Sequence, residues 1–131
     1  PIQRLWRGFD DYIGRHRIGL MFGCASFSGS DPDAHGAALS WLYHNHLAPE
    51  HLRPRVHAGR GAAMERLPRG GYDERRALHQ LPPLVKGYLR AGARFGDGAF
   101  IDRAFNTVDV CVVMPVEALA GRYAARFSVA A

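Results

Sequence analysis

The stretch at residues 81–115 constrains the fold more than any other part of the chain. Its first part repeats apolar side chains at helical spacing, so that they share one face: Leu84, Val85, Tyr88 and Leu89. Gly92 follows and can end this helix, because glycine enters the left-handed conformation without steric cost. The pattern predicts a short amphipathic helix followed by an abrupt change of direction.

Strands are predicted directly after this helix. Residues 99–105 and 108–114 are rich in β-forming side chains, and residues 106–107 suit a hairpin turn between them. The Gly-Asp-Gly at 96–98 has the composition of another turn. A further strand is predicted at 20–27, where an almost continuous apolar run indicates burial on both faces, as in an α/β sheet.

The rest of the chain supplies helices and one long connection. Apolar side chains at helical spacing predict helices at 1–17, 34–47 and 116–127. Residues 50–80 are rich in Pro, Gly and Arg and show little periodicity, which indicates a long functional or mobile connection. The 131 residues are one domain's worth of chain at most, and no apolar run approaches the roughly 20 residues of a membrane span. Together these patterns favour an α/β (α+β) class.

The net charge of the chain indicates which classes of molecule it could bind. The chain has a formal net charge of +5, and arginine supplies nearly all of its basic residues. A basic surface can attract nucleic acid, anionic lipid or an acidic protein. The charges are spread along the chain and form no basic-aromatic stripe, so a nucleic-acid-binding module is the weakest of these interpretations.

The chain has one pair of cysteines and one pair of nearby histidines that could bind a metal ion, but neither pair is predicted to do so. Cys24 and Cys111 lie in the most apolar predicted strands, which indicates a reduced, buried pair in a cytoplasmic protein, with a disulfide or metal binding as the alternative. His44 and His46 lie on a predicted helix, where residues two apart point about 200° away from each other. They cannot chelate one ion together there, so no metal site is predicted.

The run Tyr88-Leu89-Arg90-Ala91-Gly92 resembles a pattern of the GNAT superfamily of N-acyltransferases, in which a tyrosine-bearing helix ends in Y-x-x-x-G before the last two strands. The longer run LPPLVKGYLRAGARFGDGAFIDRAFNTVDV, with FGCASFSGSDPDAH upstream, is similar to bacterial ornithine N-acyltransferases. Those enzymes depend on acyl carrier protein and make lyso-ornithine lipid. The similarity extends over nearly the whole chain and is weakest at 58–76.

The resemblance implies a fold, a mixed sheet flanked by helices, and a domain organisation. Residues 1–131 would be the C-terminal portion of a single GNAT-like acyltransferase domain, with its N-terminal strands absent. Strand 108–114 would lie between strands 20–27 and 99–105, antiparallel to both. Residues 28–80 would form a helical and loop insertion, and the chain alone is expected to be inactive.

The resemblance also implies a reaction, the transfer of a (3-hydroxy)fatty acyl group from a carrier-protein thioester to the α-amino group of ornithine. This chemistry needs a neutral amine, donors for the tetrahedral oxyanion and a proton for the leaving thiolate. By position Tyr88 would be that acid, although its apolar neighbours are equally consistent with a packed ring. His35, Asp102 and Asp109 are the candidate general bases, and solvent-facing strand residues are the alternative interpretation of the two aspartates.

Three residues are candidates for binding the amino acid. An amino acid needs an acid for its ammonium group and an arginine for its carboxylate. Asp31, Asp33 and Arg103 have these side chains. Both aspartates precede a predicted helix, so capping of that helix is the competing explanation.

An acyl-phosphopantetheine thioester, carried by acyl carrier protein or CoA, would be the co-substrate, with no tightly bound cofactor. Its phosphates would meet Ile2 and Arg4, where the bare N–H groups of a helix start suit anions, and Lys86 beside the tyrosine. Acyl carrier protein and an amino acid are the implied partners, and nucleic acid is not one. The lipid product implies a cytoplasmic reaction in peripheral contact with the inner membrane.

A different class of function is consistent with the same residues. A GNAT-like domain can bind a thioester or a partner without catalysis. An Arg/Gly-containing phosphate loop directly before Pro1 would favour the enzyme, and its absence would favour the binding domain.

Overall fold

The computed structural model describes residues 20–57, 59 and 61–115. The helices predicted at 1–17 and 116–127, and with them Ile2 and Arg4, lie outside the described residues. The described elements, in chain order, are β1 (Leu20–Ser28), η1 (Pro32–His35), α2 (Gly36–His46), η2 (Glu50–Leu52), β2 (Gly61–Ala62), α3 (Glu74–Gln80), α4 (Pro83–Arg90), β3 (Arg94–Asp102) and β4 (Thr107–Pro115). They form an α+β fold, as the sequence predicts.

The strands form one sheet in the order β1-β4-β3-β2, and all of its ladders are antiparallel, so the expected mixture of parallel and antiparallel ladders is not seen among the described strands. The predicted place of β4 between β1 and β3 is therefore confirmed. Its central position explains its composition, since Val108, Val110, Val112 and Met114 are all buried. Two isolated parallel bridges, Leu47 with Phe95 and Arg55 with Asp97, extend the sheet beyond its ladders.

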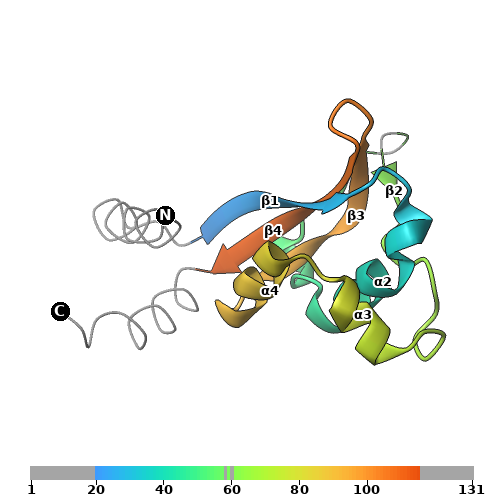
Figure 1. Ribbon diagram of the computed structural model, residues 1–131. Coiled ribbons are helices and arrows are strands. Elements are labelled where there is room, and N and C mark those ends of the chain that lie inside the picture. Colours follow the sequence, from blue (N-terminus) through green and yellow to red (C-terminus); the bar gives the residue numbers. More distant parts are fainter. Residues whose placement is uncertain (1–19, 58, 60, 116–131) are drawn as a thin grey trace.

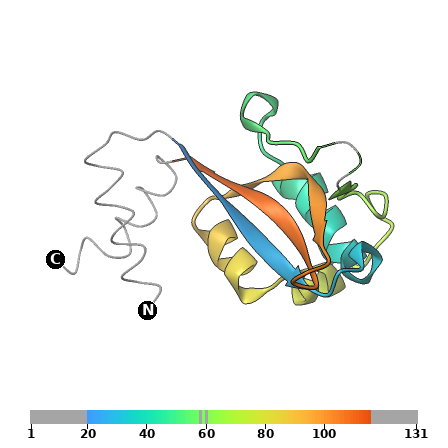
Figure 2. The ribbon, with the colours of Figure 1, turned by 90° about the horizontal axis from the view of Figure 1, so that it is seen from above.

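Helices α2, α3 and α4 gather on one side of the sheet (Figures 1 and 2). The core lies between them and the sheet, and its largest fully buried side chains include Phe27, Phe95, Leu39 and Leu42. Val85 is the buried residue of α4, and Tyr88 and Leu89 pack against the same core from partly buried positions. Three residues of the predicted apolar face thus cover the sheet, whereas the fourth, Leu84, is 42% exposed.

The prediction that β1 is buried on both faces is wrong. Ala25 and Phe27 are buried against the helices, whereas Phe22 is 61% exposed and Cys24 and Ser26 are also exposed. Side chains alternate between the faces of a strand, so a continuous apolar run does not require two covered faces. Among the described strands, β1 lies at the edge of the sheet.

The alternation of side chains along β1 and β4 also explains the exposure of the two cysteines. Cys24 and Cys111 are direct partners in the β1–β4 ladder, and both are free thiols. The prediction of a buried pair is wrong, because Cys24 is exposed and Cys111 is only half-buried. Burial raises the pKa of the Cys111 thiol, and the neighbouring Cys24 adds to this effect.

The prediction of a turn at 96–98 is also wrong, since β3 begins at Arg94 and runs through these residues. The β3–β4 register shifts between Phe95 and Ala99, which is the mark of a bulge. Residues 54–56 lie against this bulge: Asp97 N donates to Pro54 O at 2.8 Å, and Val56 N donates to Asp97 O at 3.1 Å. Gly98 has φ +99°, and a Cβ there would collide with Val56 Cγ1. The glycines therefore allow a second chain segment to approach the strand closely.

Two local predictions can be compared with the structure. Gly92 has φ +90° and follows Ala91, the C-cap of α4, as expected of a residue that ends a helix. The hairpin is confirmed, but its turn occupies residues 103–106 and not 106–107, because β3 ends at Asp102 and β4 begins at Thr107. Asn106 takes the left-handed conformation with φ +55°. Asparagine is one of the few residues that tolerate this conformation.

The long connection predicted at 50–80 contains η2, β2 and α3. Its middle part is held by Ser40, a buried residue of α2 whose Oγ accepts hydrogen bonds from Arg66 N at 3.0 Å and Leu67 N at 2.9 Å. These bonds satisfy backbone donors that an irregular segment cannot satisfy internally. The connection is therefore packed onto the helical layer along this part.

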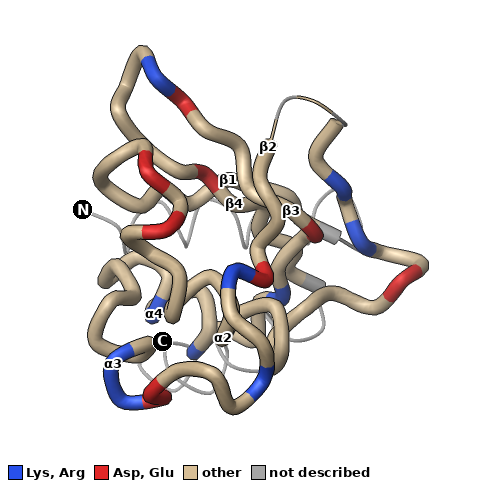
Figure 3. Tube along the Cα trace, turned by 90° about the vertical axis from the view of Figure 1, so that its right-hand side faces the viewer, with Lys and Arg blue, Asp and Glu red and all other residues tan. Residues whose placement is uncertain are grey.

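Surface charge is mixed on the described part of the molecule. Figure 3 shows Lys and Arg interspersed with Asp and Glu along the trace, without a face of one sign in this view. Among the described helices, none is long and apolar enough to cross a membrane.

Candidate functional site

The exit of β1 and the β3–β4 hairpin meet at one end of the sheet. Gly29 N donates to Asn106 O at 2.8 Å, and Ser30 N donates to Asn106 Oδ1 at 3.1 Å. The segment that follows Ser30 carries three of the predicted site residues, Asp31, Asp33 and His35, and the hairpin carries Asp102 and Arg103. The fold therefore brings five of the ten candidate site residues to one region.

Two of these aspartates have structural partners. Asp31 caps η1, since its Oδ1 accepts a hydrogen bond from Asp33 N at 3.0 Å. Asp102 Oδ1 accepts from Phe105 N at 3.0 Å and so stabilises the hairpin turn. Arg103 is exposed in that turn.

Asp33 forms an ion pair with Arg66 of the long connection. Its Oδ1 accepts from Arg66 Nε at 2.9 Å and from Arg66 Nη2 at 2.7 Å. The Asp33 side chain is 72% exposed, and that of Arg66 is 24% exposed. An ion pair with one exposed partner contributes little to stability, but it occupies one oxygen of the carboxylate.

His35 is fixed in orientation by its neighbours. Its Nε2 donates to the carbonyl oxygen of Gly29 at 3.1 Å, and its ring lies 5.2 Å from the ring of Phe27. A carbonyl can only accept, so Nε2 carries the proton and Nδ1 is the basic atom of the neutral ring. The arrangement suits a general base as well as a helix-start contact.

Tyr88 and Lys86 lie on α4, away from this region. Ala93 N, at the start of β3, donates to Tyr88 O at 3.0 Å, whereas Asp102 is at the far end of β3. Nine residues of extended chain separate these ends, which corresponds to roughly 25 Å. The structure therefore does not bring Tyr88 together with His35 or Asp102.

A cavity of about 290 Å³ lies on the open face of the sheet, the side away from the helices that carries Cys24, Ser26, Asp109 and Cys111. It is bounded by β1, β3, β4 and residues 54–56. Its charged lining residues are Arg55, Asp97 and Asp109. The bulge in β3 creates one wall, because it seats residues 54–56 beside the strand.

Asp109 is held by two hydroxyl groups. Its Oδ1 accepts from Ser26 Oγ at 2.6 Å and from Thr107 Oγ1 at 2.8 Å. Within the described residues, Oδ2 accepts no hydrogen bond. The carboxylate is thus oriented by the sheet and keeps one oxygen available for a ligand.

Arg55 reaches the same cavity from the opposite wall. Its Nε lies 3.8 Å from Asp97 Oδ2, which is too long for a hydrogen bond, so this is a loose ion pair. The side chains of Arg55 and Asp97 are 55% and 36% exposed. The terminal nitrogens of the guanidinium therefore remain available for a carboxylate.

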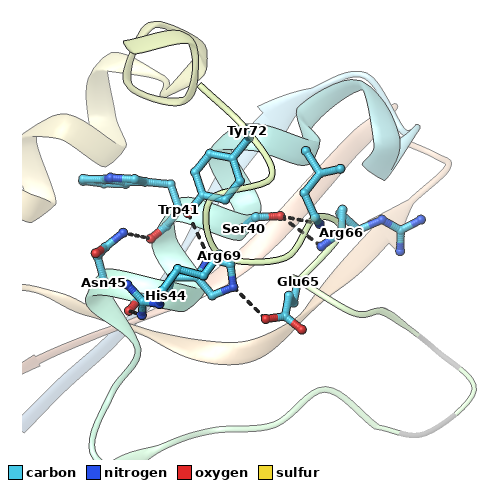
Figure 4. Close-up of polar contacts among 9 residues, drawn as sticks. Ser40, Trp41, His44, Asn45, Glu65, Arg66, Arg69 and Tyr72 are labelled. Atoms are coloured by element: carbon cyan, nitrogen blue, oxygen red, sulfur yellow. Dashed lines mark hydrogen bonds and ion pairs between the residues drawn. The ribbon is translucent and has the colours of Figure 1, made fainter. Parts of the chain in front are cut away.

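The sequence did not reveal a polar network around His44 (Figure 4). His44 Nδ1 lies 2.8 Å from Tyr72 Oη and Nε2 lies 2.6 Å from Glu65 Oε2, while Arg69 Nη2 donates to His44 O at 2.6 Å. Burial raises the pKa of Tyr72. Because Glu65 and Tyr72 are 21 and 28 residues from His44, no local pattern could have indicated the cluster. Its evident role is to attach the long connection to α2.

Comparison with curated proteins identifies relatives along nearly the whole chain. A protein of Brucella abortus named L-ornithine N(alpha)-acyltransferase is 47% identical over 122 residues, which are 93% of this chain and 43% of the relative. Proteins of the same name from Agrobacterium fabrum and Rhodobacter capsulatus are 47% and 44% identical over 93% and 91% of the chain, and over 42% and 45% of the relatives. No protein-family model and no solved structure matches the chain.

The chain spans less than half the length of these relatives and matches their C-terminal portion. The resemblance to ornithine N-acyltransferases that the sequence analysis describes is confirmed. The antiparallel sheet with flanking helices is consistent with a GNAT-like domain.

Proposed function

We propose that the intact protein is an N-acyltransferase that moves a (3-hydroxy)fatty acyl group to the α-amino group of ornithine or a similar amino acid, in the biosynthesis of ornithine lipids. The observation that carries this proposal is the 41–47% identity to four proteins named L-ornithine N(alpha)-acyltransferase, over at least 91% of the chain. The strand order β1-β4-β3 supports it, because the resemblance implies the same order.

The described unit would be the C-terminal part of the acyltransferase domain. The match to the C-terminal portion of longer relatives supports this division. The edge of β1 supports it as well, since Phe22 is 61% exposed on a strand that has a partner on one side only among the described residues. An exposed apolar edge is the usual place for a further strand to pair.

The acyl donor would be a phosphopantetheine thioester, on acyl carrier protein in preference to CoA, and it would leave as a thiolate. Tyr88 is the proposed acid for that thiolate, and the Y-x-x-x-G resemblance supports the assignment. Lys86 lies on the same short helix and would meet the phosphate. His35, whose Nε2 proton is held by the Gly29 carbonyl, lies at the opposite end of the sheet from Tyr88, so it is not proposed as the base for the same transfer.

The reaction would take place in the cytoplasm at the inner membrane, where a lipid product can enter the bilayer. The net charge of +5 supports contact with an acidic carrier protein and with anionic lipid. Nucleic acid is not a proposed partner.

The test is an acyl-transfer assay with the intact protein. Acyl carrier protein and CoA thioesters of the same acyl chain are each offered with a panel of amino acids, and products are read by mass spectrometry. We expect N-acyl-ornithine from the carrier-protein thioester. Binding of the thioester without product from any amino acid would instead identify a non-catalytic binding domain.

A further inference from the structure

We propose that the cavity on the open face of the sheet binds the amino-acid acceptor, with Asp109 receiving its side-chain ammonium group and Arg55 its α-carboxylate. The inference rests on the proposed acyl transfer to ornithine and assigns the residues that would select this substrate. Neither residue is identified as a substrate ligand by the sequence patterns, since Asp109 is there only a candidate base.

The size of the cavity suits a small acceptor. Its volume is about 290 Å³, at the lower limit of the roughly 300–1,000 Å³ of pockets for drug-sized ligands. A fatty acyl chain would need a longer apolar channel, whereas a free amino acid is of suitable size. The lining also fits an amino acid, because it combines acidic and basic groups with the apolar side chains of Val56 and Phe100.

Asp109 is prepared to receive a cation. The hydroxyls of Ser26 and Thr107 hold its Oδ1 at 2.6 and 2.8 Å, so the carboxylate needs little reorganisation when a ligand arrives. Its Oδ2 accepts no hydrogen bond from the described residues and belongs to a residue that lines the cavity. A hydrogen bond from an ammonium to a carboxylate is charge-assisted and stronger than one between neutral groups.

Arg55 is placed for the carboxylate by its backbone. The two hydrogen bonds between residues 54–56 and Asp97 set the position of this segment on β3. The loose ion pair with Asp97 keeps the guanidinium at the cavity without occupying its terminal nitrogens. These nitrogens form the planar fork that binds a carboxylate through two parallel hydrogen bonds.

The arrangement predicts a particular selectivity. A diamino acid has a carboxylate at one end, a side-chain ammonium at the other and the reacting α-amine beside the carboxylate. Asp109 would neutralise the distant ammonium and leave the α-amine unpaired, as acyl transfer requires. Norvaline has the carbon chain of ornithine without the side-chain amine, so it would leave Asp109 unpaired and bind more weakly.

The experiment compares Asp109→Asn and Arg55→Gln with two matched controls in the intact protein. Glu50→Gln and Arg76→Gln remove the same charges from exposed positions on η2 and α3. For each variant, KM is measured for ornithine and for the thioester, and kcat/KM is measured for ornithine and norvaline. Melting curves report folding, and Arg55 lies on the surface, so its variant tests the cavity even if Asp109→Asn unfolds.

We expect each cavity variant to raise KM for ornithine about tenfold or more while KM for the thioester stays within about twofold. Asp109→Asn should also bring the ornithine and norvaline values together, whereas Arg55→Gln should weaken both substrates equally. The controls should match the wild type. An unchanged KM for ornithine in folded Asp109→Asn and Arg55→Gln proteins would overturn the inference.

Failure of the proposed acyl transfer can be distinguished from failure of the proposed binding site. If the wild type acylates no amino acid, direct titration of ornithine and norvaline into the wild type and Asp109→Asn still tests the cavity. Tighter binding of ornithine that disappears in Asp109→Asn would support the site without catalysis. Equal binding of ornithine and norvaline, or no binding of either, would overturn the inference.

Discussion

The hydroxyl of Ser26 on β1 lies 2.6 Å from Oδ1 of Asp109 on β4, and the two residues are direct partners in the antiparallel ladder. Side chains that face each other in this way lie on the same side of the sheet. The register of β1 and β4 therefore decides that Asp109 is held on the open face, beside the cavity. A shift of one residue would move Ser26 to the helical side.

Asp33 of η1 is an alternative to Asp109 as the carboxylate that binds the ammonium group of the amino acid, and Asp33→Asn tests this alternative. Because the Arg66 guanidinium already neutralises the Asp33 carboxylate, whereas the partners of Asp109 are neutral hydroxyls, we expect KM for ornithine to stay within about twofold. Stability should fall by at most about 1 kcal/mol, the usual value of an exposed ion pair. KM for both substrates and a melting curve provide the measurement.

The matched variant is Asp31→Ala, which removes the η1 cap and should cost about 1 kcal/mol of stability with KM unchanged. A tenfold rise of KM for ornithine in Asp33→Asn would instead place the acceptor at this loop.

Tyr88→Phe tests the proposed acid. Loss of the hydroxyl should lower kcat by roughly 100- to 10,000-fold if Tyr88 protonates the leaving thiolate. The ring packs against the core, and phenylalanine retains these apolar contacts. Steady-state kinetics of the intact protein decide the matter, and an unchanged kcat would leave Tyr88 with a packing role.

Gly98→Ala tests the contact between β3 and residues 54–56. Alanine at φ +99° is strained, and its Cβ would collide with Val56, so we expect a loss of roughly 1–3 kcal/mol. Gly87→Ala is the matched control, because its Cβ would meet no atom within 4 Å in α4. That variant should gain about 0.5–1 kcal/mol in a helix. Chemical denaturation of both variants provides the comparison, and equal stabilities would argue against the close approach.

His46 predicts a pH dependence of stability. Burial lowers its pKa, and the charge of Arg94 lowers it further. The unfolded chain then binds more protons than the folded one between the folded pKa and about 6.5, so stability is complete above this window and is lost as the pH falls through it. His46 packs on Trp41 with ring centroids 4.7 Å apart, and phenylalanine keeps this contact. His46→Phe should therefore lose less melting temperature than the wild type between pH 7.5 and 5.5, and parallel pH profiles would contradict the assignment.

The parts of the fold that could be predicted are those that depend on neighbouring residues. The apolar spacing of Val85 and Leu89 identified α4, and Gly92 marked its end. The hairpin followed from two β-rich runs around Asn106. Asp31 was a predicted cap and is one. In each case the deciding interactions lie within a few residues, where backbone conformation and side-chain spacing act directly.

Tertiary structure alone decided which faces are covered and which distant groups meet. Phe22 and Cys24 have the apolar character of core residues but lie on an exposed face, because the position of a strand in its sheet is a property of the whole fold. The Gly-Asp-Gly sequence is compatible with a turn, yet it forms a bulge because residues 54–56 pack on it. Asp33 with Arg66, and His44 with Glu65 and Tyr72, are contacts between segments 21 to 33 residues apart. Such pairs depend on how the long connection crosses the helices. The sequence alone therefore determined the local elements and the resemblance. Packing between distant segments determined the cavity and the side chains that line it.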